Sequence, residues 1–345
     1  MSDTILMQLK ENHSLKPYNT LGVEAKAEQF ISIGAVDQLV QVLTDPNFRD
    51  IDKCVLGGGS NVLFRDDVKG LVLHISIKGI HKVREDKNHV WVRSGAGVIW
   101  HDLVLHCVER GWGGIENLSL IPGTVGAAPI QNIGAYGAEL KDVFESLEAV
   151  ETETGEVRTF TYDECRFGYR DSIFKNELKG KYIITHCTLR LSRHPEVNTS
   201  YGAIQARLEE RGVTDPTIRD ISETVIDIRR SKLPDPDALG NAGSFFKNPV
   251  VSKEKYDQLK RRYPEIPGYP LEGPVVKVPA GWLIEETGWK GKVVGNAGTY
   301  HNQALVIVNH GGATGTEILQ LAEKVKTAVH ERFGIELEPE VNIIP

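Results

Sequence analysis

The residues best suited to perform chemistry lie in the stretch 241–249, Asn-Ala-Gly-Ser-Phe-Phe-Lys-Asn-Pro. Gly243 lets a substrate approach the backbone closely, and the Ser244 hydroxyl can both donate and accept a proton. Lys247 and Asn248 supply hydrogen-bond donors of the kind that an anionic ligand needs. We therefore predict a reacting centre around Ser244. The alternative that this stretch leaves open is a surface loop with an ordinary turn serine.

Two further polar clusters favour a reacting centre. Residues 165–174 carry Arg166 and Arg170 beside aromatic residues, and Glu340 lies in an apolar, strand-like run near the C-terminus. A guanidinium binds a carboxylate bidentately, and a carboxyl group can take part in proton transfer. Arg166 competes with Arg170, and we expect Arg166 to be salt-bridged or to lie over an aromatic ring. Glu338 competes with Glu340, because residues two apart on a strand face the same side.

Two glycine-rich segments precede these clusters. Residues 57–61, Gly-Gly-Gly-Ser-Asn, follow a strand-like run, and their backbone N–H groups could form a nest for a phosphate. They match neither a Walker A loop nor a dinucleotide fingerprint. Residues 121–137 are apolar but too rich in Gly and Pro for a helix or central strand. Such a segment suits a dry wall against the flat ring of a cofactor; the alternative is a buried loop of unusual composition.

Composition limits the class of protein. A chain of 345 residues with 40% apolar and 25% charged residues is typical of a soluble protein with two or three domains. The formal net charge of -7 gives no support to nucleic-acid binding, and no apolar run is long enough to predict a membrane span. The four cysteines lie too far apart for a zinc site, so we expect no metal and reduced thiols in a cytoplasmic protein.

The periodicity predicts a mixture of helices and strands, and therefore an α+β fold. We expect helices over 36–43, 104–108, 218–230 and 318–333, the last with a Thr314–Glu317 capping box, and strands over 54–56, 71–77, 90–93, 182–191 and 304–309, with a hairpin formed by 147–151 and 157–160. Residues 192–201 read as a polar break, and 232–236 cannot remain helical because of their prolines.

In combination these motifs resemble the MurB family, the UDP-N-acetylenolpyruvoylglucosamine reductases. The match runs from Asn12 to Val341 and includes residues 19–22, 57–61, 121–137, 169–172, 232–234, 243–249 and 339–341. Tyr201, with Gly202 and the stretch to Leu208, looks like the substrate-capping tyrosine loop of the longer, type I branch of the family.

The resemblance implies a two-part FAD-binding module of the vanillyl-alcohol-oxidase-like (PCMH-type) class and a C-terminal α+β substrate domain. The expected parts are an N-terminal segment 1–20, the FAD-binding module 21–193 with two subdomains split near 75, the tyrosine loop and linker 194–213, the substrate-binding domain 214–312, and a C-terminal helix and strand 313–345 that carries the catalytic glutamate.

The resemblance also implies the reaction. NADPH would reduce a non-covalently bound FAD, and the enolpyruvyl ether of a UDP-sugar would then receive the hydride, giving UDP-N-acetylmuramate for peptidoglycan synthesis. We expect a cytoplasmic monomer that acts on this small molecule, with no nucleic-acid or membrane partner.

The residue roles follow by position in the motifs. Ser244 matches the proton donor, Arg170 the arginine at the enolpyruvyl carboxylate, and Glu340 the catalytic glutamate, which settles its competition with Glu338. The expected substrate contacts are Tyr169, Tyr201, Lys232, Asn248 and Gln303. The expected cofactor contacts are Gly57, Gly58, Gly59, Ser60, Asn61, Ser119, Ile121, Pro122, Gly123, Gly126, Ala127, Gln131, Asn132, Gly134, Ala135 and Tyr136.

Two other functions are compatible with parts of this pattern. An FAD-dependent oxidase of the same fold, acting on another alcohol, would share the glycine-rich segments. A non-enzymatic binder of flavin or sugar nucleotide would not need the serine, arginine and glutamate together.

Overall fold

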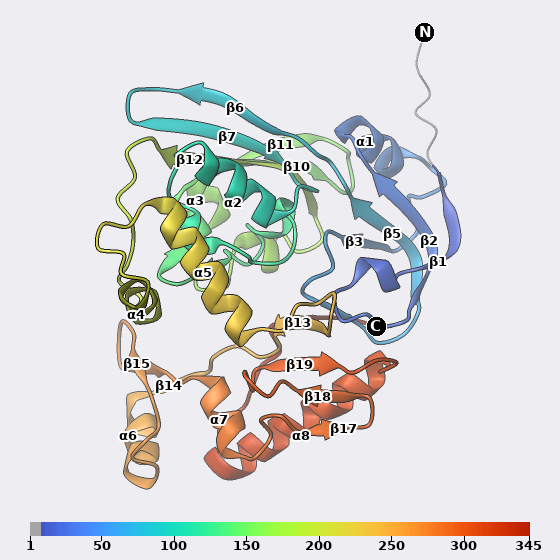
Figure 1. The fold of residues 1–345 in the computed structure, drawn as a ribbon. Helices are drawn as coiled ribbons and strands as arrows, with labels where there is room; N and C mark the ends of the chain where they lie inside the picture. The colour runs from blue at the N-terminus through green and yellow to red at the C-terminus, as the bar shows by residue number, and fades with distance from the viewer. Residues whose placement is uncertain (1–7) are drawn as a thin grey trace. The chain divides into compact units, whose positions relative to one another are not determined.

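The computed structural model describes residues 8–345, and their contacts group the chain into two compact units. The N-terminal unit holds the described residues up to His13 together with Ala27–Gly58 and Lys69–Arg229. The C-terminal unit holds Ser14–Lys26, Gly59–Val68 and Arg230–Pro345. Figure 1 shows the mixture of sheets and helices that the α+β prediction expected. Among the described residues, no helix is both long and apolar enough to cross a lipid bilayer.

The first sheet of the N-terminal unit has the strand order β1-β2-β5-β3. The strands are β1 (Lys10–Ser14), β2 (Lys26–Ile33), β5 (Val68–Ile75) and β3 (Lys53–Leu56), with β3 parallel to β5. Helix α1 (Val36–Thr44) covers one face, where Leu39 packs with Ile31 and Leu71. The loop that continues β3 is the first glycine-rich segment, so this sheet sets where that loop begins.

The second sheet is antiparallel, in the order β11-β10-β12-β7-β6. Its strands are β11 (Val157–Thr161), β10 (Phe144–Glu151), β12 (Tyr182–Ser192), β7 (His89–Gly95) and β6 (Ile80–Glu85). Helix α2 (Trp100–Glu109) packs on it through Leu103 and Val104 against Val90 and Val92.

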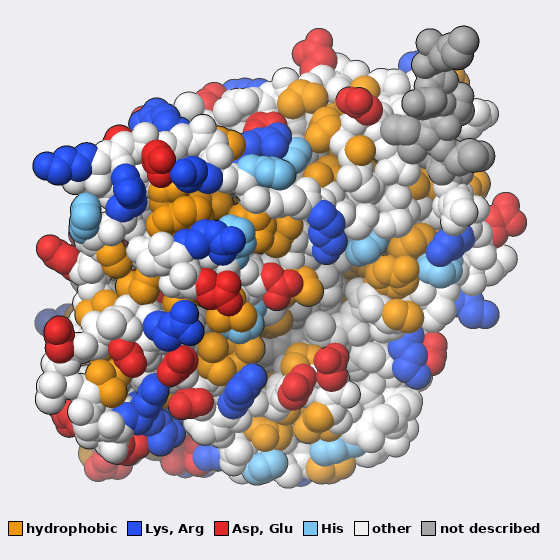
Figure 2. Space-filling view, turned by 45° about the horizontal axis from the view of Figure 1, so that its top comes forward, with side chains coloured by type: hydrophobic (Ala, Val, Ile, Leu, Met, Phe, Trp, Pro, Cys, Tyr) orange, Lys and Arg blue, Asp and Glu red, His pale blue; other side chains and the backbone are white. Residues whose placement is uncertain are grey.

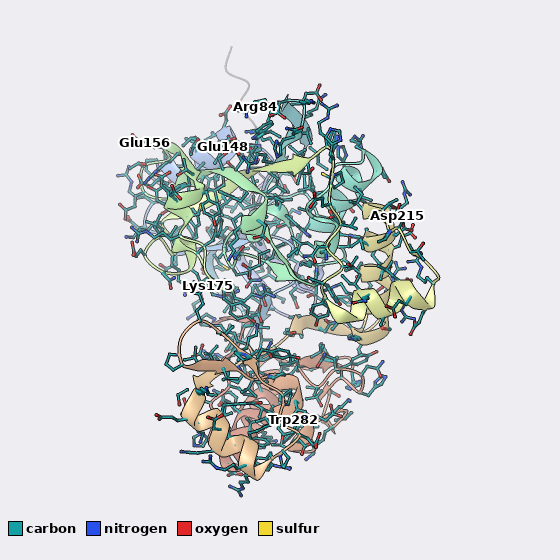
Figure 3. The ribbon with its side chains drawn as sticks, turned by 90° about the vertical axis from the view of Figure 1, so that its left-hand side faces the viewer. Arg84, Glu148, Glu156, Lys175, Asp215 and Trp282 are labelled. Carbon is teal, nitrogen blue, oxygen red and sulfur yellow. The ribbon has the colours of Figure 1, made fainter. Side chains whose placement is uncertain are left out.

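The same five-stranded sheet carries a charged pair. Arg93 donates two hydrogen bonds of 2.6 and 2.7 Å to the Glu148 carboxylate, which Figure 3 labels, and this lowers the pKa of Glu148. Arg84 lies over the Trp91 ring, 3.5 Å from its centroid. On the face drawn in Figure 2, Lys and Arg are interspersed with Asp and Glu and do not form a contiguous basic patch.

Short elements replace long strands where the second glycine-rich segment runs. They are η2 (Glu116–Leu118), η3 (Val125–Ala127), the hairpin β8 (Gly134–Ala135) and β9 (Ala138–Glu139), and η4 (Leu140–Asp142). The segment with the two arginines lies between α3 (Tyr162–Cys165) and η5 (Ile173–Lys175). Helices α4 (Gly202–Glu210) and α5 (Ile218–Lys232) pack on each other through Ile204, Leu208, Ile221, Val225 and Ile228.

The C-terminal unit contains three sheets and three helices among its described residues. The sheets have the orders β13-β19-β18-β17, β14-β16-β15 and β20-β4. The elements are η1 (Lys16–Tyr18), β4 (Val62–Phe64), β13 (Gly240–Ser244), β14 (Val250–Ser252), α6 (Lys253–Arg262), β15 (Tyr269–Pro270), β16 (Val275–Lys277), α7 (Ala280–Glu286), β17 (Val293–Val294), β18 (Ala297–Thr299), β19 (Val306–Asn309), α8 (Gly315–Phe333) and β20 (Asn342–Ile344). Its core includes Phe245 and Phe246, whose rings meet edge to face.

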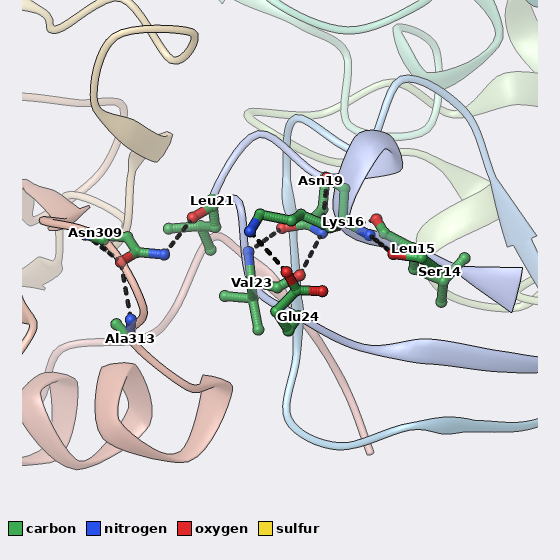
Figure 4. Close-up of polar contacts among 10 residues, drawn as sticks. Ser14, Leu15, Lys16, Asn19, Leu21, Val23, Glu24, Asn309 and Ala313 are labelled. Atoms are coloured by element: carbon green, nitrogen blue, oxygen red, sulfur yellow. Dashed lines mark hydrogen bonds and ion pairs between the residues drawn. The ribbon is translucent and has the colours of Figure 1, made fainter.

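Two buried asparagines hold the segment 14–26 in place, one from within it and one from β19 (Figure 4). Asn309 donates 2.9 Å to the carbonyl of Leu21, and its own oxygen accepts from the N–H groups of Gly311 and Ala313. Asn19 closes the preceding turn, because its amide both donates to and accepts from the backbone of Val23. These amides take the place of a regular strand ladder.

Most predicted elements are confirmed, and two differ. The 147–151 and 157–160 hairpin is β10 and β11, and α8 begins with the expected Thr314–Glu317 capping box. The tyrosine loop is not a loop throughout: residues 202–210 form helix α4, with Tyr201 just before its first turn. Helix α5 continues to Lys232, so this lysine ends a helix instead of sitting in a turn.

Candidate active site

The two glycine-rich segments meet inside the N-terminal unit. A Cβ on Gly57 would lie 2.6 Å from Thr124 Oγ1, and one on Gly58 would lie 3.2 Å from Gly123 Cα. Similarly, a Cβ on Gly126 would lie 2.5 Å from that of Ala96. Only glycine permits such close backbone approach, which explains why the sequence repeats it here.

The backbone donors at this junction fit a dinucleotide. The N–H groups of Gly57, Gly58, Gly123 and Thr124 donate no hydrogen bond to any described residue. Converging backbone N–H groups make an anion site, and a diphosphate needs such donors. The donor set therefore fits the FAD that the glycine-rich segments predicted.

Two predicted cofactor contacts use their side chains inside the protein. The buried Ser119 hydroxyl donates to the Glu116 carbonyl at 2.7 Å and lies 2.8 Å from the Ser222 hydroxyl. The Asn132 amide is likewise bonded to protein groups. The expected contacts of these two residues and of the remaining cofactor residues, including Ile121, stay predictions.

Arg170 sits in a tight turn with unusual backbone geometry. Gly168 and Asp171 exchange two backbone hydrogen bonds, and Arg170 between them has a φ of 52°, in the left-handed region. Its guanidinium donates to the Gly134 carbonyl, and the Lys175 ammonium (Figure 3) donates 3.1 Å to the Arg170 carbonyl. The turn therefore places the Arg170 guanidinium against the β8–β9 hairpin, which belongs to the segment predicted to face the cofactor.

Arg166, the competing arginine, has a structural partner. It forms an exposed ion pair with Glu177, with 2.7 Å between Nη1 and Oε1. The expectation that Arg166 is salt-bridged is therefore confirmed.

Ser244 is the last residue of β13 and pairs with Val306 of β19. A register shift lies between Asn241 and Ser244, and Gly243 within it has a φ of 68°, which favours glycine. The Asn241 side chain closes this bulge by accepting from the Gly243 N–H at 3.0 Å. Bulges of this kind re-aim a side chain, and the half-buried Ser244 directly follows this one.

Glu340 lies beside this strand because the C-terminal segment runs antiparallel to it. The Glu340 N–H donates 2.8 Å to the Phe245 carbonyl, and Lys247 N–H donates 2.9 Å to the Glu338 carbonyl. Asn61, a predicted cofactor contact, donates 3.2 Å to the Glu340 carbonyl. The competitor Glu338 instead pairs with Lys247 at 3.1 Å and is 76% exposed, whereas Glu340 is half-buried.

Two predicted substrate residues support the backbone of the C-terminal unit. Asn248 accepts 2.9 Å from the N–H of Ala280 at the start of α7, so its amide nitrogen faces elsewhere. Gln303 accepts from the Leu305 N–H, and the Leu305 carbonyl accepts in turn from the Phe245 N–H. Gln303 is thus linked through the backbone of Leu305 to Phe245, the residue after Ser244.

Tyr201 contacts a predicted cofactor residue, Tyr136, edge to face at 5.1 Å. Arg229 of α5 donates a hydrogen bond to the Tyr136 hydroxyl and another, at 3.2 Å, to the Leu120 carbonyl. Burial lowers the pKa of Arg229 and raises that of Tyr136. Their mutual interaction acts against both shifts, because Tyr136 raises the pKa of Arg229 and Arg229 lowers that of Tyr136. The Tyr201 ring is 46% exposed and therefore available to a ligand.

The remaining substrate candidates are exposed cations and rings. Lys232 ends α5 and is exposed. Tyr169 is 46% exposed, and its ring lies 5.5 Å from the Arg170 guanidinium carbon. An exposed ammonium and an exposed ring suit the diphosphate and sugar parts of a nucleotide ligand.

The cysteines play no part in this geometry. All four are free, and burial raises the pKa of Cys54 to about 11 and those of Cys107 and Cys165 to about 12. Within residues 8–345 no cluster of His, Cys, Asp and Glu could hold a metal ion. Neither finding offers a nucleophile or a metal centre to compete with Ser244.

The structure thus assembles two halves of the predicted site. The C-terminal unit brings Ser244, Glu340 and Asn61 together, and the N-terminal unit brings Arg170 to the β8–β9 hairpin. Because Arg170 belongs to a different unit from Ser244 and Glu340, the convergence of all three stays a prediction.

Three residues of this geometry were not singled out from the sequence. Thr124 lies inside the quoted apolar segment, and its hydroxyl packs against Gly57. Arg229 and Asn117 act through partners far away in the sequence, the Tyr136 hydroxyl and the backbone of Tyr136 and Asn198. An arginine on an otherwise apolar helix face was the only available signal for Arg229.

Comparison with known proteins identifies the family. Residues 235–344 match the family model "UDP-N-acetylenolpyruvoylglucosamine reductase, C-terminal domain", and residues 27–161 match "FAD binding domain". A UDP-N-acetylenolpyruvoylglucosamine reductase of Flavobacterium johnsoniae is 52% identical over 98% of this chain and 100% of that protein. A reductase of the same name from Pseudomonas aeruginosa is 48% identical over 98% of this chain and 99% of its own length.

A solved structure agrees with these sequence matches. The crystal structure of UDP-N-acetylenolpyruvylglucosamine reductase (MurB) from Thermus caldophilus has a TM-score of 0.70 and 26% identity, covering 99% of this chain and 100% of that one. With these matches beside the glycine-rich segments and the pairing of Glu340 with Phe245, the residue after Ser244, the chain belongs to the UDP-N-acetylenolpyruvoylglucosamine reductase family of FAD-containing oxidoreductases.

Proposed function

We propose that this chain reduces UDP-N-acetylenolpyruvoylglucosamine to UDP-N-acetylmuramate, with NADPH as the reductant and non-covalent FAD as the carrier. The observation that carries the proposal is the pairing of residues 245–247 with 338–340, which places Glu340 opposite Phe245, the residue after Ser244, in a chain of this family. When bound, FAD supplies the hydride, from N5 to the terminal carbon of the enolpyruvyl group.

Ser244 is the proposed proton donor to the carbon next to the one that accepts the hydride. A hydroxyl is a weak acid, so its position must be fixed for the transfer to be fast, and a positioned acid is worth roughly 10²–10⁴-fold in rate. The bulge closed by Asn241 and the buried rings of Phe245 and Phe246 fix the Ser244 backbone from both sides. Glu340 on the neighbouring segment is proposed to polarise the substrate carboxylate or to return the proton to Ser244.

Arg170 is proposed to bind the enolpyruvyl carboxylate, where negative charge develops during hydride addition. A preorganised donor of this kind is typically worth about 3 kcal/mol of barrier. The left-handed turn and its anchors hold the guanidinium in place before the substrate arrives, so little reorganisation is needed.

The diphosphate and sugar of the substrate need local cations and donors, because the protein as a whole carries a formal charge of -7. Lys232, Asn248, Tyr201, Tyr169 and Gln303 are proposed for these contacts. We further propose a cytoplasmic monomer without nucleic-acid or membrane partners. Light scattering after size-exclusion chromatography would measure its oligomeric state.

The test separates the two half-reactions under anaerobic conditions. NADPH should bleach the flavin absorbance of the wild-type protein, and the enolpyruvyl substrate should restore it. S244A should be bleached normally but recover roughly 10²–10⁴-fold more slowly. S244C, the matched control, keeps an ionisable proton on a side chain of similar size and should recover at an intermediate rate.

Other outcomes would overturn specific parts. Normal recovery of S244A would remove Ser244 as the proton donor. Bleaching of the wild type without recovery would discard the substrate, and rapid oxygen consumption with an alcohol would then indicate the oxidase, which the comparisons do not favour.

A further inference from the structure

Asn132 is a fully buried asparagine in the segment predicted to contact the cofactor. Its amide nitrogen donates 2.9 Å to the Gly168 carbonyl and 3.0 Å to the Glu139 carboxylate. Its oxygen accepts 3.0 Å from the Lys141 N–H. An asparagine amide has two N–H donors, so both are engaged within the protein. The side chain therefore has no donor left for a flavin.

The backbone of Asn132 is adapted to this task. Its φ of 42° lies in the left-handed region, which asparagine tolerates better than most residues other than glycine. The conformation turns the chain from Gln131 into the β8–β9 hairpin while the side chain points back to the protein interior. Asparagine thus meets two demands here, the backbone angle and the pair of donors.

The group that Asn132 holds on one side is the Arg170 turn. The Gly168 carbonyl accepts from both the Asp171 N–H and the Asn132 amide, so it anchors the turn from inside and outside. A non-glycine residue in the left-handed region is strained, and Arg170 is such a residue. External anchors must offset that strain, or the turn relaxes.

The group that Asn132 holds on the other side is the hairpin that receives the guanidinium. Gly134, two residues along the chain, accepts from the Arg170 guanidinium, Glu139 is the last residue of β9, and Lys141 lies in the following η4. Asn132 therefore bonds both the turn that carries Arg170 and the hairpin that its side chain contacts. Loss of the amide frees both ends of this linkage without touching the guanidinium itself.

We propose that Asn132 is a positioning residue that sets the Arg170 guanidinium for the substrate carboxylate, and that its side chain does not hold the cofactor. This rests on the proposed function of Arg170. A misplacement of about 1 Å can cost about 10²-fold in rate. A side chain that bonds the Arg170 turn can therefore affect the rate without contacting the substrate.

The kinetic test uses a double-mutant cycle. N132A should retain FAD and normal bleaching by NADPH, and slow the recovery of absorbance with substrate about 10–100-fold. R170A should slow recovery by about 10²–10³-fold, and N132A should add little in the R170A background, because its effect passes through Arg170. E139Q keeps an acceptor for the Asn132 amide and is the control, with recovery near that of the wild type.

A second readout does not depend on the reaction. Hydrogen exchange followed by mass spectrometry should show faster exchange over 168–176 in N132A, because the Asp171 N–H loses its anchored acceptor. Exchange in β10 and β12 should be unchanged. If the wild type is never reoxidised by the substrate, the proposed function fails, and the exchange data alone still decide whether Asn132 holds the turn.

Three results would overturn the proposal. One is loss of FAD or slow bleaching in N132A, which would make Asn132 a cofactor contact. Another is a multiplicative effect of N132A and R170A on recovery, which would make the two residues independent. The third is unchanged exchange over 168–176, which would show that the turn does not need the amide.

Discussion

The replacement of Asn309 by alanine should destabilise the C-terminal unit by about 3 kcal/mol. The substitution removes the donor to the Leu21 carbonyl and the acceptor for the Gly311 and Ala313 N–H groups. Gly311 is exposed and can turn to water, whereas Leu21 and Ala313 are 0% and 3% exposed. Two buried backbone groups thus lose their partners, at about 1–3 kcal/mol each.

The assay is urea denaturation of the full chain with tryptophan fluorescence as the probe. Trp282 (Figure 3) and Trp289 report on the C-terminal unit, and a loss of about 3 kcal/mol should move its midpoint by about 1 M. Hydrogen exchange over residues 19–25 assigns the effect, since the Asn309 bond to Leu21 anchors this segment.

N309D is the matched control. It has the same shape and keeps the acceptor for Gly311 and Ala313, but at neutral pH it cannot donate to Leu21. Its cost should shrink as the pH falls, because protonation of the introduced carboxyl restores a donor. A midpoint shift below about 0.3 M in N309A, with unchanged exchange over 19–25, would refute the reasoning.

Three further predictions rest on other contacts. N117A should raise the KM for the substrate more than it lowers kcat, because the Asn117 amide joins the Tyr136 and Asn198 carbonyls and so holds the segment before Tyr201, which we propose contacts the substrate; equal effects on both would contradict this. Burial raises the pKa of Glu116 above its ordinary value, so wild-type stability should fall as the pH rises from about 4.5. E116Q should lose that part of the pH dependence, and parallel curves of stability against pH for the two proteins would contradict this prediction. The four thiols should resist alkylation at neutral pH and react together after unfolding; rapid labelling of Cys54 in the native protein would contradict its raised pKa.

The sequence predicted the regular elements well because their signals are local. The periodicity of α1, the alternation in β12 and the capping box of α8 depend on neighbouring residues, and each is confirmed. Helix α4 was missed because its sequence is polar and follows the Pro195 break, so its few apolar contacts with α5 are visible only after folding.

The candidate site likewise combines residues that local motifs predict with contacts that only the folded chain reveals. The residue types at Ser244, Arg170 and Glu340 could be named from motifs, and the choice of Glu340 over Glu338 rested on its position in the family motif. The structure adds a physical reason for that choice, because Glu338 is exposed and paired with Lys247. No local pattern encodes a pairing between residues 91 or more positions apart.

Buried asparagines explain much of what the sequence could not reveal. The described residues include five of them, Asn19, Asn117, Asn132, Asn241 and Asn309, and each uses its amide on backbone groups of an irregular segment. A site built on loops leaves backbone groups without a ladder, and burying them unpaired would be costly. An uncharged amide can supply a donor and an acceptor at once, which neither serine nor aspartate does as well at neutral pH.

This pattern has a consequence for how the enzyme can vary. A change from asparagine to aspartate keeps the shape of the side chain and removes only its donors, so it should be damaging at all five positions, although no ligand contact is lost. The damage should differ in kind: the donors of Asn19, Asn241 and Asn309 hold backbone carbonyls of the C-terminal unit and should affect stability, whereas those of Asn132 hold the Arg170 turn and should affect turnover. Stability and catalysis are therefore separable at the level of one residue type, because the same amide is used to hold different segments of the chain.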